Sequence, residues 1–128
     1  MKDKDDYIRE LNIAIGIQGM WNHKVVNSIK NGGDIQFLSN VGECDTCKFA
    51  KWLDNDLDNE FKSSVYYPKL LKLHKDIHIA ADKAAKLFLE GKKKEAVEMV
   101  EMGGDFGIAR RKLTNFLKAR MKYWEEQE

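Results

Sequence analysis

Proline, histidine and cysteine are rare in this chain of 128 residues, which has one proline, three histidines and two cysteines. The scarcity of proline, together with few β-branched runs, favours an all-α fold. The polar start Met-Lys-Asp-Lys-Asp-Asp is unlike a secretory signal, and no window approaches the roughly 20 apolar residues of a membrane span. We therefore expect a soluble, cytoplasmic protein with no membrane partner.

Neither sign of charge dominates the composition. Lysine and arginine number 22, aspartate and glutamate 21, and the net charge is +1. Binding to nucleic acid through phosphate neutralisation needs a basic surplus, so no nucleic-acid partner is expected. The length predicts one domain covering residues 1–128, and no output domain is attached within it.

Apolar residues recur every three or four positions in long stretches, as in amphipathic helices. The first stretch covers about residues 4–31 and is expected to end at Asn31-Gly32-Gly33-Asp34, where a glycine is available for a left-handed cap. The loop that follows, from 32 to about 44, carries Phe37, Leu38 and Val41 and is expected to pack down onto the core. These features predict a long first helix followed by a folded connection.

Three further helical segments follow, and the last of them could be one helix or two. A short helix is expected to begin near Cys47, capped by Asp45 or Thr46. Another helix should hold Pro68 in its first turn and end near Glu90-Gly91. Residues 93–125 are predicted as one helix with close contacts at its glycines; the alternative is two helices with Asp105 as a new cap. The predicted fold is an up-down four-helix bundle with one short extra helix carrying a cysteine.

The stretch around His74 and His78 carries most of the chemistry. These two histidines are four residues apart in a helical segment, so their rings share one face. Zinc takes four ligands in a tetrahedron, commonly imidazole and thiolate. A third imidazole from His23 and a thiolate from Cys47, at a helix start that favours an anion, would complete such a set. The residue types alone leave open a plain structural role for the histidines.

The spacing of these residues resembles the CZB family, the chemoreceptor zinc-binding domains. The matching residues are His23-Lys24-Val25, then Cys47-Lys48-Phe49-Ala50-Lys51-Trp52, then His74-Lys75-Asp76-Ile77-His78. The sequence departs from the family pattern at Val25, where an aromatic residue is common, and at Ala50, where glycine is usual. The resemblance covers about residues 11–120.

The resemblance implies zinc held by His23, Cys47, His74 and His78 in a bundle that often forms a homodimer. It implies a regulatory module rather than an enzyme, because four protein ligands leave zinc no open position for a substrate. Members of the family accompany diguanylate cyclases or soluble chemoreceptors, and some sense zinc or oxidants such as hypochlorous acid. A zinc-thiolate switch acting on a chemotaxis or cyclic-di-GMP signalling partner is therefore expected, and residues 44–53 are its expected moving part.

Cys44 gives the sequence a second feature, Cys44-Asp45-Thr46-Cys47, which on its own is typical of redox or metal chemistry. Cys44 could be an inert neighbour, a resolving thiol that forms a disulfide with Cys47, or a competing zinc ligand. Two alternatives to the zinc sensor stay open at this stage: a Cys44–Cys47 redox switch, and a metal-free helical dimerisation module. Copper is not excluded by affinity, whereas a di-iron site needs more histidines and carboxylates than the chain offers.

Overall fold

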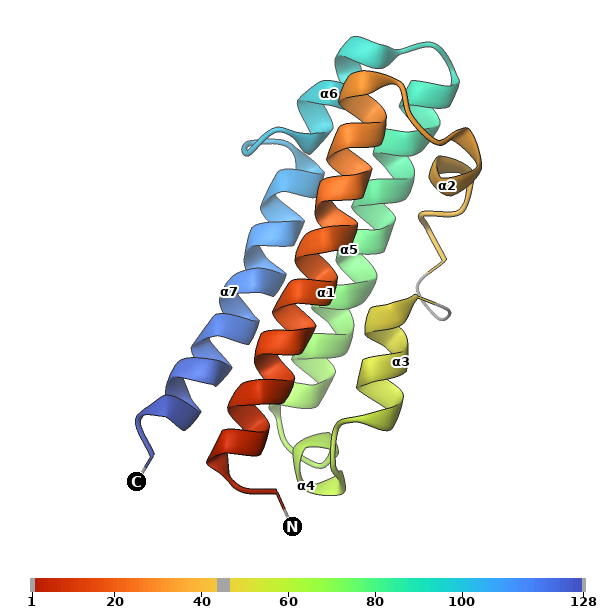
Figure 1. The fold of residues 1–128 in the computed structure, drawn as a ribbon. Coiled ribbons are helices and arrows are strands. Elements are labelled where there is room, and N and C mark those ends of the chain that lie inside the picture. The colour runs from red at the N-terminus through yellow and green to blue at the C-terminus, as the bar shows by residue number, and fades with distance from the viewer. Residues whose placement is uncertain (1, 44–46, 128) are drawn as a thin grey trace.

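The protein is all-helical in the computed structural model, which describes residues 2–43 and 47–127. Three long helices, α1 (Lys4–Asn31), α5 (Tyr66–Leu89) and α7 (Asp105–Glu125), run side by side (Figure 1). Four shorter helices connect them: α2 (Ile35–Ser39), α3 (Lys48–Asn55), α4 (Asn59–Lys62) and α6 (Lys93–Val100). None of the helices in these described ranges is long and apolar enough to cross a membrane.

The ends of the first long helix follow directly from its sequence. The side chain of Asp3 accepts a hydrogen bond from the backbone amide of Asp6, and the Asp6 side chain accepts one in return from the Asp3 amide. This reciprocal capping box satisfies two amides that the helix leaves without partners. The helix ends at Gly32, whose φ of 70° is left-handed, as its cap position requires. The predicted bounds of this helix are confirmed.

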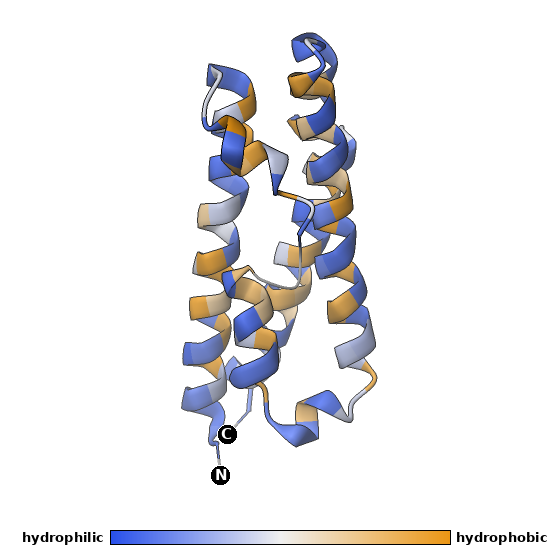
Figure 2. Ribbon diagram, turned by 90° about the vertical axis from the view of Figure 1, so that its right-hand side faces the viewer, coloured by the Kyte–Doolittle hydropathy of each residue, from blue (hydrophilic) through white to orange (hydrophobic). Residues whose placement is uncertain are grey.

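A continuous core lies between the long helices. Apolar and polar residues alternate along them with the helical period, so that apolar bands recur down each ribbon (Figure 2). Leu38 and Val41, from the connection after α1, are 0% and 2% exposed, so this segment packs down as expected. The largest side chains buried to below 2% exposure are those of Phe49, Phe106, Ile29, Leu38, Leu70, Ile77, Leu113, Leu117, Val25 and Val100.

The prediction of one helix over residues 93–125 is wrong. The chain forms α6 and α7, and Gly104 stands at the N-cap of α7 while Asp105 is its first residue. A Cβ on Gly104 would lie 2.1 Å from the Glu98 carbonyl oxygen, and one on Gly107 would lie 2.0 Å from that of Glu101. These glycines therefore let the chain turn closely against the end of α6, the helix that precedes them. They do not make the close contact with a separate helix that was expected.

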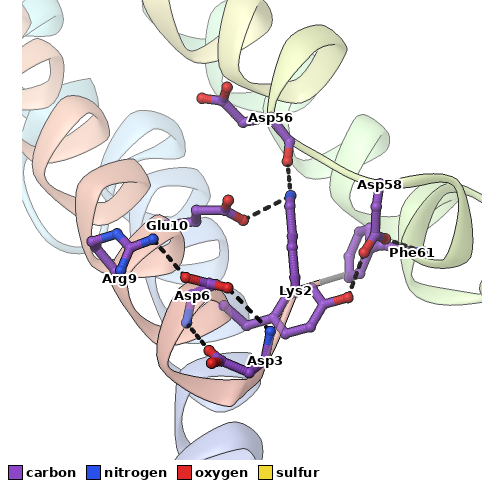
Figure 3. A network of polar contacts seen from close by, with 9 residues as sticks. Lys2, Asp3, Asp6, Arg9, Glu10, Asp56, Asp58 and Phe61 are labelled. Carbon is purple, nitrogen blue, oxygen red and sulfur yellow. Dashed lines mark hydrogen bonds and ion pairs between the residues drawn. The ribbon is translucent and has the colours of Figure 1, made fainter.

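A polar network ties the end of the molecule where both termini lie (Figures 1 and 3). Lys2 contacts Glu10 and the Asp56 carbonyl, while the Tyr7 hydroxyl donates to Asp58. Asp58 also caps α4 by accepting from the Phe61 amide at 2.9 Å. The network joins the start of α1 to the segment between α3 and α4, and so holds the end of α3 that lies farthest from Cys47.

Candidate metal centre

Cys47 stands at the N-cap of α3 and points its sulfur back over the first turn. The Sγ atom accepts a hydrogen bond from the Ala50 amide at 3.3 Å. Cysteine thus takes the role that serine or aspartate usually has at this position. Asp45 and Thr46, which the sequence offered as caps for this helix, lie outside the described residues, and the structure shows Cys47 at the N-cap. A helix N-terminus stabilises negative charge, so the position suits a thiolate.

His74 and His78 supply two imidazoles from one face of α5. They are 4% and 2% exposed, and their Nε2 atoms lie 3.1 Å apart. The Cys47 Sγ atom lies 3.2 Å from Nε2 of His74, so α3 contributes a third donor to the same point. The donor atoms of Cys47, His74 and His78 all lie within 4.8 Å of one another. The two segments are 27 residues apart in the sequence and meet at these side chains.

The backbone carbonyl of Val41 determines which nitrogen His78 offers. His78 Nδ1 lies 2.7 Å from this oxygen. A carbonyl oxygen only accepts hydrogen bonds, so Nδ1 carries the proton and Nε2 presents its lone pair. Metal-binding histidines are commonly oriented in this way, with the second nitrogen donating to a carbonyl or carboxylate. His78 is therefore already in the tautomer that a metal ion at Nε2 requires.

Aromatic rings close around the two imidazoles. The Trp21 ring lies 4.5 Å from that of His78 between centroids, and the Phe49 ring lies 5.0 Å from that of His74. On its other side Phe49 packs against Trp52, with centroids 5.4 Å apart. These contacts hold the imidazoles in place and exclude water from one side of the donor atoms.

His23 does not join this group. It is exposed on α1, while its neighbour Asn22 is only 6% exposed and accepts a hydrogen bond from Gln18 at 2.8 Å. Adjacent positions on a helix lie about 100° apart around its axis, so burial of Asn22 turns His23 outward. The structure thus assembles three of the four residues predicted as ligands. Cys44, the possible redox partner or competing ligand, lies outside the described residues.

A cavity of about 710 Å³ opens beside the donor atoms. Cys47 and His78 form part of its wall, together with residues of α1 and α2 such as Trp21 and Phe37. The Lys24 ammonium lies over the Phe37 ring, 4.4 Å from its centroid. The cavity gives small molecules a route to the sulfur and to one of the imidazoles.

The donor set fits a zinc ion. A tetrahedral ion with bonds of about 2.0–2.3 Å holds its donors about 3.3–3.8 Å apart. The observed separations of 3.1 and 3.2 Å are close to that range. Thiolate with imidazole is also the combination that zinc prefers among the abundant cellular cations. A Cys/His/His cluster that can hold a metal ion is therefore present, as the sequence predicts.

Some of the contacts that support the donor residues could not be predicted from the sequence. Nothing in it marks Val41, because its contribution is a backbone oxygen. Phe49 is within the motif around Cys47, and its apolar character was the available signal. The contact between Trp21 and His78 depends on how α1 packs against α5, which the sequence does not show.

No family model, no curated protein and no solved structure matches this chain. The resemblance to the CZB domains consequently depends on the spacing of His23, Cys47, His74 and His78, and the metal centre on the geometry of the last three.

Proposed function

We propose that this chain is a zinc-binding regulatory domain, similar to the CZB domains, in which the Cys47 thiolate is the responsive ligand. The observation that carries the proposal is the meeting of Cys47 Sγ with the Nε2 atoms of His74 and His78, with His78 oriented by the Val41 carbonyl. The proposed architecture is an up-down four-helix bundle in which α2 and α3 together occupy one position, between α1 and α5.

The chain's own residues prepare the site for metal. Val41 fixes the tautomer of His78, the α3 N-terminus favours the thiolate form of Cys47, and Phe49 packs against His74. When bound, zinc would keep the thiolate ionised and join α3 to α5. Ligands that must be deprotonated make occupancy depend on pH and on free zinc, which is the property required of a zinc sensor.

Cys47 is the ligand most open to a chemical signal, because the cavity reaches its sulfur. Transfer of one oxygen atom from hydrogen peroxide converts a thiolate to a sulfenic acid and leaves hydroxide, and the sulfenic acid is a poorer metal ligand. Hypochlorous acid belongs to the same class of two-electron oxidants. The proposal therefore includes response to oxidants as well as to zinc, with a chemotaxis or cyclic-di-GMP signalling protein as the partner.

The size of the response is limited by the packing of α3. Phe49, Trp52 and Leu53 are 2%, 3% and 2% exposed. Burial of each such side chain stabilises the folded chain by about 1.5–3 kcal/mol. Loss of one sulfur ligand does not outweigh that packing, so we expect the first turn of α3 to move rather than the whole helix.

Metal content is the experiment that tests this proposal. The protein is purified under reducing conditions without added metal and its elements are measured by mass spectrometry, beside Cys47→Ser. We expect one zinc per chain in the parent and a reduced zinc content in the variant. A well-folded parent that neither retains zinc nor binds added zinc would overturn the proposal. Release of zinc by hydrogen peroxide, followed with a colorimetric chelator, then tests the oxidant response separately.

His23→Ala and Cys44→Ser address the remaining ligand. The resemblance assigns it to His23, which the structure places on the exposed side of α1. Loss of zinc in Cys44→Ser, with retention in His23→Ala, would assign the ion to a two-cysteine, two-histidine set. The opposite pattern would restore the set that the resemblance implies.

A further inference from the structure

A groove runs over the surface between α5 and α7, which lie antiparallel to each other (Figure 1). It contains a hollow of about 250 Å³ whose walls include Leu73 and Ile79 of α5 and Ile108 of α7. Ile79 is 45% exposed and Ile108 is 38% exposed. Single exposed apolar residues are common on protein surfaces, but large ones that gather in one groove are typical of a binding surface.

Aromatic rings extend the groove toward the start of α5 and the end of α7. The Tyr66 ring lies 6.4 Å from that of Phe116 between centroids. The Arg120 guanidinium lies 4.0 Å from the centroid of the Tyr66 ring and 4.6 Å from that of the Tyr123 ring. The two tyrosines are 37% and 44% exposed. Tyrosine and arginine are enriched where protein interfaces gain most of their binding energy, so this end of the groove resembles an anchor point.

The two helices that form the groove are strongly basic, although the whole chain is nearly neutral. Five basic and two acidic residues lie in α5, and six basic and two acidic residues lie in α7. These helices together carry a net charge of +7, whereas the rest of the chain carries −6, because the total is +1. A positive field of this kind attracts acidic partners and steers their approach.

Basic side chains stand on both walls of the groove without acidic partners. Lys83 of α5 and Lys112 of α7 line the hollow, and Arg120 lies at the aromatic end. Within the described ranges, no carboxylate lies at ion-pair distance from any of the three. The acidic residues there have local roles. Asp76 pairs with a lysine of its own helix at 2.7 Å, and Asp105 begins α7, where the helix dipole favours negative charge.

We propose that this α5–α7 groove is the docking surface for an acidic amphipathic helix of another protein, the signalling partner. The apolar stripe of that helix covers Ile79 and Ile108. Acidic residues on either side of the stripe pair with Lys83 on one wall and with Lys112 on the other. Between Tyr66 and Lys83, α5 rises about 26 Å, at about 1.5 Å per residue, so a docked helix of about five turns fills the groove.

The shape of the groove favours a helix over a membrane or a nucleic acid. Side chains that enter a lipid surface protrude from the face of a helix, whereas Ile79 and Ile108 line a hollow between two helices. A nucleic acid binds chiefly through its phosphates and gains little from an apolar floor. An apolar floor between basic walls matches an amphipathic helix with acidic flanks.

The groove and the metal centre use different sides of α5. His74 and His78 are 4% and 2% exposed, and neither belongs to the lining of the groove. The proposal names the class of partner for the proposed regulatory function and rests on that function in this respect, but docking itself does not require the ion. A protein without zinc that binds the helix, and a protein with zinc that does not, are therefore separate outcomes.

Fluorescence anisotropy with a defined peptide tests the groove. The probe is a labelled helix of about 18 residues with leucine at heptad positions a and d, glutamate at e and g and alanine elsewhere. Its control carries lysine in place of every glutamate. We expect the acidic peptide to bind the zinc-loaded and the zinc-free parent, and the basic one to bind at least about tenfold more weakly. A parent that binds neither peptide, or both equally, would overturn the proposal.

Substitutions in the groove locate the binding site. Ile79→Glu and Lys112→Glu should each weaken binding of the acidic peptide at least about fivefold, with the helix content unchanged by circular dichroism. The matched controls are Met102→Glu and Lys93→Glu, at exposed positions outside the groove, and both should stay within about twofold of the parent. Parent-like affinity in both groove variants would contradict the proposed surface.

Other classes of occupant are tested with the same variants. Phosphatidylserine-containing vesicles and a single-stranded oligonucleotide are titrated in turn, and weaker binding of both than of the acidic peptide supports the proposal. Tighter binding of either one, lost in Ile79→Glu and Lys112→Glu, would overturn a protein helix as the occupant. Sedimentation velocity of the parent alone addresses a second copy of this chain. Self-association that the two groove variants abolish would overturn the proposal as well.

Discussion

The Nε2 atoms of His74 and His78 lie 3.1 Å apart, each ring buried and each held by an aromatic neighbour. Two imidazole nitrogens at that distance either share one proton or share one metal ion. Replacing His74 or His78 with alanine should therefore reduce zinc affinity by more than the roughly 10–100-fold typical of a supporting residue. Competition with a chromophoric chelator measures this change. Wild-type affinity in both variants would contradict the metal centre.

His23→Ala is the matched histidine control for those variants. His23 is exposed on α1 and its side chain is outside the donor group. We expect this variant to keep zinc with an affinity within about threefold of the parent, since a single exposed substitution perturbs stability by at most about 0.5 kcal/mol. A loss comparable with that of His74→Ala would show that α1 supplies a ligand in solution.

A substitution at Gly42 can disrupt the hydrogen bond between His78 and the Val41 carbonyl without changing His78 itself. A Cβ at Gly42 would lie 3.0 Å from Asp82 Oδ1, and the residue before it provides the Val41 carbonyl that binds Nδ1. Gly42→Ala should displace that carbonyl and weaken zinc binding about tenfold, as loss of a supporting hydrogen bond does.

The double variant Gly42→Ala, Asp82→Ala removes the crowding and should recover most of the affinity. Calorimetric titration of the metal-free proteins with zinc measures all three. Equal zinc affinity in the single and double variants would show that the contact between the added Cβ and Asp82 does not cause the weaker binding. Gly19→Ala, where an added Cβ meets nothing within 4 Å, is the control and should leave zinc binding unchanged.

Tyr7 and Asp58 should make the metal-free protein sensitive to acid. Burial disfavours the ionised form of Asp58, but hydrogen bonds from the Tyr7 hydroxyl and the Phe61 amide outweigh it and lower the pKa of this carboxyl. A lowered pKa contributes stability above the ordinary value of 3.8 that is lost as the pH falls through the folded value. The bond to Asp58 in turn raises the pKa of Tyr7 above its ordinary 10.0, so its contribution is present below pH 10 and lost at higher pH.

Tyr7→Phe removes the hydroxyl and keeps the stacked contact with Trp124, whose ring centroid lies 4.2 Å away. We expect it to lower the free energy of unfolding by about 1 kcal/mol at pH 7, because the bond is charge-assisted but partly solvent-screened. The difference should shrink below pH 3.8, where Asp58 in the unfolded chain is protonated. Urea unfolding in excess chelator measures it. A difference that stays constant down to pH 2 would contradict the assignment.

The spacing of apolar residues predicted where the helices begin and end better than it predicted which residues point toward the core. The span of α1, its end at a glycine-containing stop and the start of a helix near Cys47 all follow from local chemistry visible in the sequence, whereas the choice of Gly32 over Gly33 as the cap comes from the structure. The break between α6 and α7 depends on contacts of Gly104 and Gly107 with carbonyl groups several residues earlier, which a list of residue types does not display.

The position of His23 is a different case, because the sequence contains the information needed to find it. Val25 and Ile29 define the inward side of α1, and both are 0% exposed. A residue two positions from Val25 lies about 200° from it around the helix, so His23 belongs to the outer side. The pair His74 and His78 was predicted correctly for the same reason, since residues four apart do share a face.

The N-cap residue of α3 is a cysteine, and its Sγ atom accepts the first hydrogen bond of the helix. A chemical modification of the thiol can therefore weaken that hydrogen bond without any change in sequence. An N-cap contributes roughly 0.5–2 kcal/mol to the helix that it begins. Alkylation, oxidation or metal exchange at Cys47 therefore alters how often the first turn, Lys48 to Lys51, frays open. Amide hydrogen exchange at Ala50, whose N–H is the one bonded to the sulfur, would report the chemical state of the thiol as an exchange rate.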